Sequence, residues 1–201
     1  MHLEIWLAGV LSAGVSASYF AGAQRIALLV MVPLTLLQVV VSPVISRLRA
    51  YSDLAVLEQT ARSSSSVLVG TACLLCVPLL VVPGNLLLLV FGNQLLPAAS
   101  LLPLLGISYV LRAASGLSSM VLSMSNFEGI ASSFQWAEVV ARGGVGTWAL
   151  MTWGPIGLAV SSLLVSAATV ATLWWLSYRH LGIRSYPTVR PSLRLLARVR
   201  A

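Results

Sequence analysis

The stretch that decides the fold runs from Ser132 to Tyr178 and reads SSFQWAEVVARGGVGTWALMTWGPIGLAVSSLLVSAATVATLWWLSY. It contains two apolar runs, 132–152 and 156–178. Each run is close to the ~20 residues that a helix needs to cross the hydrocarbon core of a bilayer. Trp153-Gly154-Pro155 separates them, and a Gly-Pro pair of this kind marks a turn. The stretch therefore predicts two consecutive membrane-spanning helices joined by a short turn.

The same apolar character extends over the whole chain of 201 residues, of which 58% are hydrophobic and 8% are charged. Soluble globular proteins carry about 25% charged residues. A chain with so little polar surface cannot coat a water-soluble globule, so lipid must replace water around much of it. The composition excludes a secreted disulfide scaffold, a disordered tail and a conventional soluble enzyme.

Three further spans are expected before this stretch, at 19–45, 65–82 and 101–123. Residues 1–10 are apolar but too few to cross a bilayer, and they predict the end of a helix or a short re-entrant piece, followed by a turn at 12–18. Residues 52–62 predict an amphipathic connecting helix, and 86–91 predict a short helix at the membrane surface. The expected fold is all-α: a polytopic membrane helix bundle with about five full transmembrane helices and a truncated N-terminal one.

The net charge of +7 comes from twelve arginines, and the chain has no lysine. The arginines cluster in 46–63 and in the C-terminal tail, whereas 83–99 and 153–155 carry no charge. By the positive-inside rule the arginine-rich segments face the cytoplasm, which places the C-terminus inside the cell. The expected organisation is a transmembrane helical domain over 1–182 and a basic cytoplasmic tail over 183–201. The lipid bilayer, and not a nucleic acid, is the expected partner of this basic charge.

A succession of motifs carries a resemblance to a known family. SYFAGAQR at residues 18–25 leads into an apolar helix that ends with VSPVISRL at 41–48, and LVFGNQ follows at 89–94. In order and spacing, from about residue 3 to about residue 182, the chain resembles the C-terminal half of polysaccharide or O-antigen flippases of the multidrug/oligosaccharidyl-lipid/polysaccharide exporter superfamily. The resemblance implies flippase-like export of a lipid-linked oligosaccharide across the bacterial inner membrane.

Members of that family build a central cavity from two pseudo-symmetric halves, and the resemblance covers the second half. It therefore implies an anionic lipid-linked sugar as the substrate and a separate N-terminal transporter half as a partner. Two alternatives stay open: a non-transporting membrane module or truncated remnant, and half of a multidrug exporter. A multidrug exporter should need an acidic cavity, whereas this sequence places more arginine than glutamate inside its expected spans.

The candidate substrate-binding residues are the four charges inside the expected spans: Arg112, Arg142, Glu138 and Arg25. A charge at the bilayer centre costs about 2.5–3.5 kcal/mol even on insertion scales, so it usually faces a partner or a water-filled cavity. A guanidinium group offers phosphate oxygens a planar fork of donors, which suits a lipid diphosphate. Glu138 is expected to be the one acidic residue at this depth, so it can neutralise either Arg112 or Arg142 but not both.

The four residues admit different interpretations. Arg112 has no acidic residue within one helical turn and is expected to face the cavity. The Glu138–Arg142 pair, four residues apart, fits a cavity wall and a structural ion pair equally well. Arg25 is expected to reach the outer head groups. Glu4 is a charge that interrupts the first apolar run.

The sequence indicates neither an enzyme nor a cofactor site. It contains no nucleophile–base pair, Gly-rich phosphate loop or carboxylate pair. Cys73 and Cys76 form a CxxC pattern in an apolar helix without a His or acidic neighbour, so no metal site is expected.

Small residues such as Ser108, Ser115 and Gly146 predict close helix packing, with hydrogen bonds to a sugar as the alternative. Four tryptophans near span ends suit an interfacial belt: Trp148, Trp153, Trp174 and Trp175.

Overall fold

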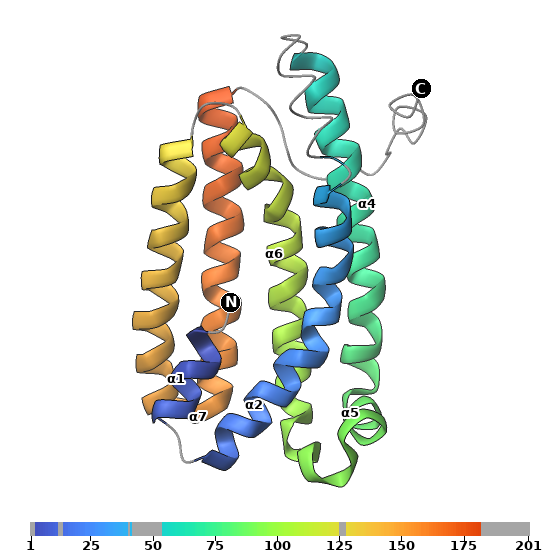
Figure 1. Ribbon diagram of the computed structural model, residues 1–201, viewed down its shortest axis with the longest axis vertical. Helices are drawn as coiled ribbons and strands as arrows, with labels where there is room; N and C mark the ends of the chain where they lie inside the picture. The colour runs from blue at the N-terminus through green and yellow to red at the C-terminus, as the bar shows by residue number, and fades with distance from the viewer. Residues whose placement is uncertain (1–2, 12–13, 40, 42–53, 125–127, 182–201) are drawn as a thin grey trace.

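The computed structural model describes residues 3–11, 14–39, 41, 54–124 and 128–181. Every element in these segments is a helix, and the helices run side by side along one long axis (Figure 1). In chain order they are α1 (Leu3–Leu11), α2 (Gly14–Ala27), η1 (Leu28–Met31), α4 (Leu54–Val81), α5 (Pro83–Phe91), η2 (Gly92–Ser100), α6 (Leu101–Met124) and α7 (Glu128–Leu181). The expected all-α helix bundle is confirmed.

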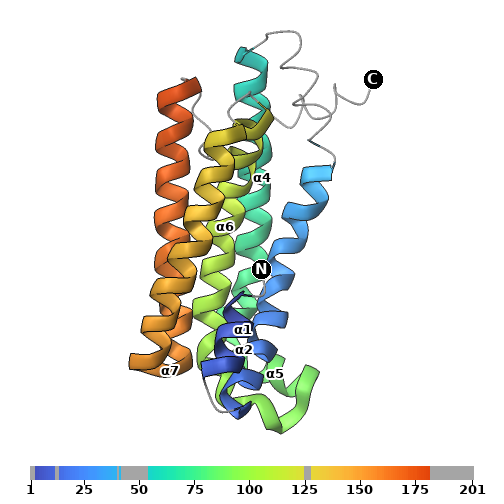
Figure 2. The same ribbon diagram turned by 60° about the vertical axis from the view of Figure 1, so that its left-hand side comes forward.

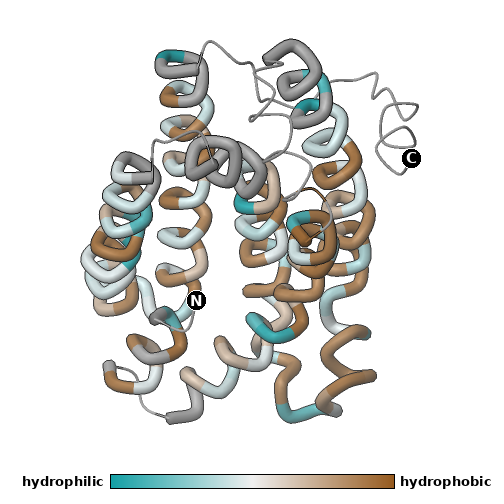
Figure 3. Tube along the Cα trace, turned by 45° about the horizontal axis from the view of Figure 1, so that its top comes forward, coloured by the Kyte–Doolittle hydropathy of each residue, from teal (hydrophilic) through white to brown (hydrophobic). Residues whose placement is uncertain are grey.

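Within the described segments, four helical stretches are long and apolar enough to cross a membrane: Ala17–Val39, Arg62–Val81, Pro83–Ser115 and Ser132–Leu176. Figure 3 shows hydrophobic residues along most of the length of these helices, with hydrophilic residues in short patches. The backbone N–H and C=O groups of such helices are hydrogen-bonded within the helix, as the bilayer core requires. The chain is a multi-pass membrane protein.

The longest element, α7, is folded in two at Gly154. Gly154 has φ 65° and ψ −153°, a conformation that a side chain would strain, and Pro155 follows it. The guanidinium of Arg142 lies 2.8 Å from the Ser166 hydroxyl, although the two residues are 24 positions apart and a straight helix would separate them by about 36 Å. Two legs of α7 therefore lie against each other (Figures 1 and 2), as the turn predicted at 153–155 requires.

Gly157 explains how closely the chain turns back at this point. A Cβ atom at Gly157 would collide with the carbonyl oxygen of Ala149 and with the Cβ of Trp153. Further along, a Cβ at Gly146 would lie 3.1 Å from Leu158 of the opposite leg. Small residues on both sides thus let the legs pack closely, which is the packing role expected for Gly146.

The connecting helix expected at 52–62 and the span expected from Ser65 form one continuous helix, in which the stretch able to cross a membrane begins at Arg62. One helix, α4, runs without interruption from Leu54 to Val81. The polar serines at 63–66 do not break it, because a serine hydroxyl can bond within its own helix, as Ser66 does to the Arg62 carbonyl at 2.8 Å. The helix ends where Pro83 disfavours a helical conformation at Val82, whose φ and ψ are −132° and 52°.

The expected turn at 12–18 is also too long. Helix α2 begins at Gly14, so residues 14–18 are already helical. The helical path then continues to Val39, and the expected end of this span at 45 lies outside the described residues. It tightens into η1 just before Pro33, which has no N–H to offer the preceding turn.

The short helix expected at 86–91 is present as α5, at one end of the bundle (Figure 1). Its Leu87 is fully buried, whereas Leu89 is 84% exposed on the outside. Gly92, with φ 72°, ends this helix and starts η2, which leads into α6. This exposed apolar surface at a bundle end is what a helix at the membrane surface presents.

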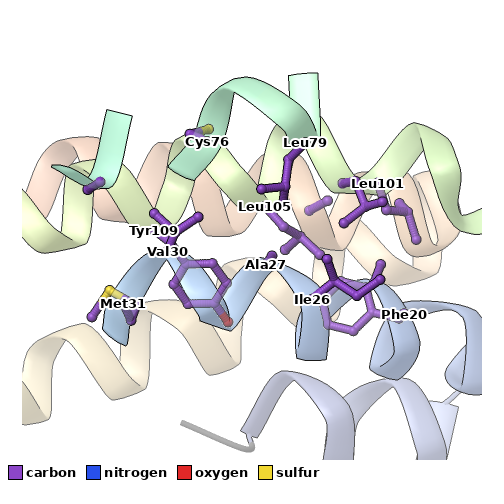
Figure 4. Packing of buried hydrophobic residues seen from close by; sticks show 14 of the residues in the cluster. Phe20, Ile26, Ala27, Val30, Met31, Cys76, Leu79, Leu101, Leu105 and Tyr109 are labelled. Carbon is purple, nitrogen blue, oxygen red and sulfur yellow. The ribbon is translucent and has the colours of Figure 1, made fainter. Parts of the chain in front are cut away.

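The hydrophobic core lies around α6, which packs against α2, α4 and α7. Leu105 and Tyr109 of α6 meet Phe20 and Val30 from the α2–η1 region (Figure 4). Cys76 of α4 is buried on the other side of α6, and a Cβ at Gly106 would lie 3.0 Å from its sulfur. Cys76 therefore acts as a small core residue, as its apolar surroundings indicated.

Several parts of the sequence-based prediction lie outside the described residues. These are the end of the first span at 42–45, the arginine-rich segment over 46–53 and the basic tail at 183–201. The proposed domain boundary at 182 falls at the edge of this region, directly after α7 ends at Leu181.

Candidate functional site: a charge chain inside the bundle

Arg142 lies at the centre of a group of charged and polar side chains contributed by α1, α6 and both legs of α7. Its Nε donates to Glu138 Oε1 at 2.9 Å, one helical turn back. One terminal nitrogen donates to Glu4 Oε1 at 2.6 Å, and the other donates to the Ser166 hydroxyl at 2.8 Å. A further contact of 3.3 Å joins Arg142 to the Ser162 hydroxyl. All three nitrogens of this guanidinium are therefore engaged.

Glu138 links Arg142 to Arg112. The same oxygen, Oε1, that accepts from Arg142 lies 3.5 Å from a terminal nitrogen of Arg112. Arg112 stands near the middle of α6, and its side chain is 27% exposed, compared with 9% for Arg142. Glu138 of α7 thus supplies the partner that Arg112 lacks in its own helix, and the Arg112 side chain remains partly exposed.

The fourth member, Glu4, was missed as a site residue. It is 7% exposed and comes from α1, which lies beside the legs of α7 with its N-terminal end near their mid-height (Figure 1). The expectation that Glu138 is the one acidic residue at this depth is therefore wrong. The signal in the sequence was a lone carboxylate inside an apolar run, but no spacing rule connects it to Arg142, 138 positions away.

Glu4, Arg142, Glu138 and Arg112 form a line of alternating charges, here called the charge chain. Two carboxylates balance two guanidinium groups in it, whereas the spans as a whole keep the expected excess of arginine, because Arg25 lies outside the charge chain. Buried charges are tolerated when they are paired and hydrogen-bonded, and each link of the chain supplies such a partner. This balance explains how a membrane bundle accommodates four ionised groups at mid-length.

Polar side chains from neighbouring helices hold the carboxylate of Glu4 in place. The amide nitrogen of Gln24, on α2, lies 3.4 Å from Glu4 Oε2, while Glu4 Oε1 accepts from Arg142. Gln24 also contacts Tyr109 of α6 through a side-chain hydrogen bond. Glu4 is therefore fixed from two directions, and the polar network ties α1, α2, α6 and α7 together.

Arg25, the remaining candidate, is not part of the charge chain. Its side chain is exposed on the surface of α2, while its neighbours Gln24 and Ile26 are buried. This placement fits the expectation that Arg25 reaches toward lipid head groups and does not line an interior site.

The small residues near the charge chain serve packing. Ser108 and Ser115 are buried on α6 and donate to the carbonyls of Leu104 and Arg112 in their own helix, at 2.8 Å and 2.9 Å. The hydroxyl protons of these two serines are therefore used within their own helix. Of the serines near the site, Ser162 and Ser166 instead turn toward Arg142.

The site has no features of a metal centre among the described residues: no three His, Cys, Asp or Glu side chains gather there or elsewhere in those segments. The arrangement offers an arginine whose side chain is partly exposed, Arg112, together with a carboxylate that two arginines share, Glu138. Such a pair can bind an anion through Arg112 or a cation through Glu138. No family model, no curated protein and no solved structure matches this chain.

Proposed function

We propose that this protein is one half of a flippase-like exporter of lipid-linked oligosaccharide, and that Arg112 contacts the anionic diphosphate of the substrate. The observation that carries the proposal is the partly exposed side chain of Arg112 at mid-length of a membrane helix, where a charge is costly. Its contact with Glu138, at 3.5 Å, is the longest ion pair of the charge chain. An anionic ligand can replace this weak contact at little cost.

The chemistry of the ligand follows from the donor. Arginine stays charged at any physiological pH and presents two parallel N–H groups to a phosphate. Arg142 is unsuited to that task because its nitrogens already bind Glu4, Glu138 and Ser166. In the proposal Arg142 and Glu138 hold the site together, and Arg112 provides the contact with substrate.

Export of a cationic drug is the second candidate function, and the geometry gives it one supporting observation. The equal number of carboxylates and guanidinium groups in the charge chain removes the argument that the interior is too basic for a cation. The Glu138 side chain, however, is 13% exposed; it accepts a hydrogen bond from Arg142 and forms an ion pair with Arg112. A carboxylate so strongly neutralised is a poor site for another cation, so the anionic substrate is favoured.

A purely structural role is favoured for part of the charge chain. The contacts of Arg142 join α1 to both legs of α7, and such contacts stabilise the packing of these helices. The proposal therefore separates the charge chain into a structural centre at Arg142 and an accessible end at Arg112.

The proposed location is the bacterial inner membrane, with the C-terminus in the cytoplasm. One end of the bundle contains the start of α4 and the end of α7, with Arg62 and Arg179, whereas the end with α5, η2 and the turn at Gly154 has no charged side chain in 83–100 or 150–158 (Figure 1). Cytoplasmic ends carry the excess of arginine. Exposed tryptophans mark both ends: Trp148 and Trp153 near the turn, and Trp175 under the guanidinium of Arg179 at 5.0 Å.

This orientation predicts which introduced cysteines react from outside the cell. In a background without Cys73 and Cys76, cysteines at Asn85 and Trp153 should react with an impermeant thiol reagent in intact cells, and one at Ser192 should react only after lysis. Trp153 is preferred to Gly154, because a cysteine at Gly154 would be strained by the positive φ. Labelling of Ser192→Cys in intact cells would reverse the proposed orientation.

The exporter function predicts dependence on a companion half. Transporters of this kind place their substrate site between two repeats. In a strain that lacks its oligosaccharide flippase, co-expression of this chain with a matching N-terminal half should restore surface glycan and raise the abundance of the chain, whereas either half alone should not restore glycan. A co-purifying complex that is abundant and inserted but restores no glycan would overturn the proposed function.

A further inference from the structure

We propose that Glu4 is a positioning residue: it sets how firmly Glu138 holds Arg112, and thereby how available Arg112 is to an anionic ligand. Glu4 and Arg112 stand at opposite ends of the charge chain and come from different helices, α1 and α6. The effect on an anion rests on the proposed role of Arg112, whereas the link between Glu4 and Arg112 rests on the contacts alone.

The link follows from the sharing of one oxygen atom. Glu138 Oε1 accepts from Arg142 at 2.9 Å and lies 3.5 Å from Arg112, so the two guanidinium groups compete for it. Glu4 binds Arg142 at 2.6 Å, the shortest contact in the chain. While Glu4 compensates Arg142, the negative charge of Glu138 remains for Arg112.

The competition changes when the charge of Glu4 is removed. Arg142 then keeps Glu138 as its carboxylate partner, and the charge chain carries one net positive charge instead of none. In a partly desolvated interior this charge is felt over several ångströms. Arg112 is released from Glu138, and an anion beside it is bound more tightly.

This arrangement gives Glu4 a specific part in export. A substrate that crosses the membrane must be released as well as bound, so an uncompensated arginine at mid-depth would retain a diphosphate. Glu4 keeps the interior neutral, and its own position is secured because Gln24 holds its second oxygen at 3.4 Å. The short helix α1 thus serves the site by delivering one fixed negative charge.

The binding test uses the full chain in lipid nanodiscs, with its companion half where present, and inorganic pyrophosphate as the probe. E4Q, which removes the charge and keeps the shape, should bind pyrophosphate about tenfold more tightly than the unchanged protein, a Coulombic effect of one charge at this range. E4D keeps the charge and should bind like the unchanged protein. Arg25→Gln, at an exposed position, is the matched control and should leave the affinity unchanged. If E4D and E4Q shift the affinity equally, Glu4 acts through packing and the inference is overturned.

A double-mutant cycle on thermal unfolding tests the link independently of any ligand. E4Q leaves an excess positive charge, so R112Q should lower the Tm less in the E4Q background than in the unchanged protein. The decrease in Tm of the combined variant should therefore be smaller than the sum of the two single decreases. The same cycle with Arg25→Gln should be additive. If the Tm decreases of E4Q and R112Q are additive, the inference is overturned, regardless of the result for pyrophosphate binding. Coupled unfolding without any pyrophosphate binding overturns the proposed function but supports Glu4 as the residue that controls Arg112.

Discussion

Replacing Arg142 with alanine is expected to destabilise the bundle by about 3–5 kcal/mol, the cost of breaking a buried ion pair by removing one partner. The change would leave Glu4, 7% exposed, without its 2.6 Å cationic partner, and it would remove the donor that holds Glu138 at 2.9 Å. It would also disconnect α1 and the second leg of α7 from the first. A loss of this size is a large part of the total stability of most domains.

The measurement is thermal unfolding of the purified protein in mild detergent, together with its abundance in membranes. Arg25→Ala is the matched control, because that arginine is exposed, and it should unfold like the unchanged protein. Changing Glu4 and Glu138 to glutamine in addition to Arg142→Ala should recover part of the loss, since no carboxylate is then left unpaired. An Arg142→Ala variant that unfolds at the temperature of the unchanged protein would contradict the structural role.

Arg112→Ala should have the opposite profile: nearly normal abundance and no export. Glu138 keeps its shorter hydrogen bond to Arg142 when Arg112 is removed, so the bundle loses only its weakest ion pair. The substrate, in contrast, loses the guanidinium that is open to it. We expect loss of surface glycan in a complemented strain by at least about tenfold, because a hydrogen bond to a charged group contributes about 1.5–3 kcal/mol.

Arg112→Lys provides the graded control for that experiment. Lysine keeps the charge but binds as a point charge without the planar fork of two donors. Export should therefore return in part and remain below that of the unchanged protein. Equal export with lysine and arginine would show that charge suffices and that the two-donor geometry is not used.

Much of the fold could be predicted because local features encode it. The turn at Gly154 follows from a Gly-Pro pair between two apolar runs, and the Glu138–Arg142 pair follows from a four-residue spacing on one helix face. The change in hydropathy within α4 indicated where the membrane span begins, near Arg62, but not that the connecting helix and the span are continuous. A helix passes such a change freely when its serines bond to their own carbonyls, as Ser66 does.

The candidate site could be predicted only in part. Arg112, Arg142 and Glu138 stand out as charges inside apolar spans, and the structure brings them together. Glu4 could not be found in this way, because its contact with Arg142 depends on how α1 packs against α7, and periodicity does not encode the packing of distant helices. The neutrality of the charge chain, which depends on Glu4, could therefore not be predicted either.

The most direct measurement of the central claim compares Arg112→Ala with the combined Arg112→Ala, Glu138→Ala variant, scoring surface glycan and membrane abundance for each. If Arg112 contacts substrate, Arg112→Ala is present at a nearly normal level and neither variant exports, because removing Glu138 cannot replace the lost phosphate contact. If Arg112 only neutralises Glu138, the single variant is depleted and the combined variant recovers both abundance and export. Full export by Arg112→Ala would contradict the account.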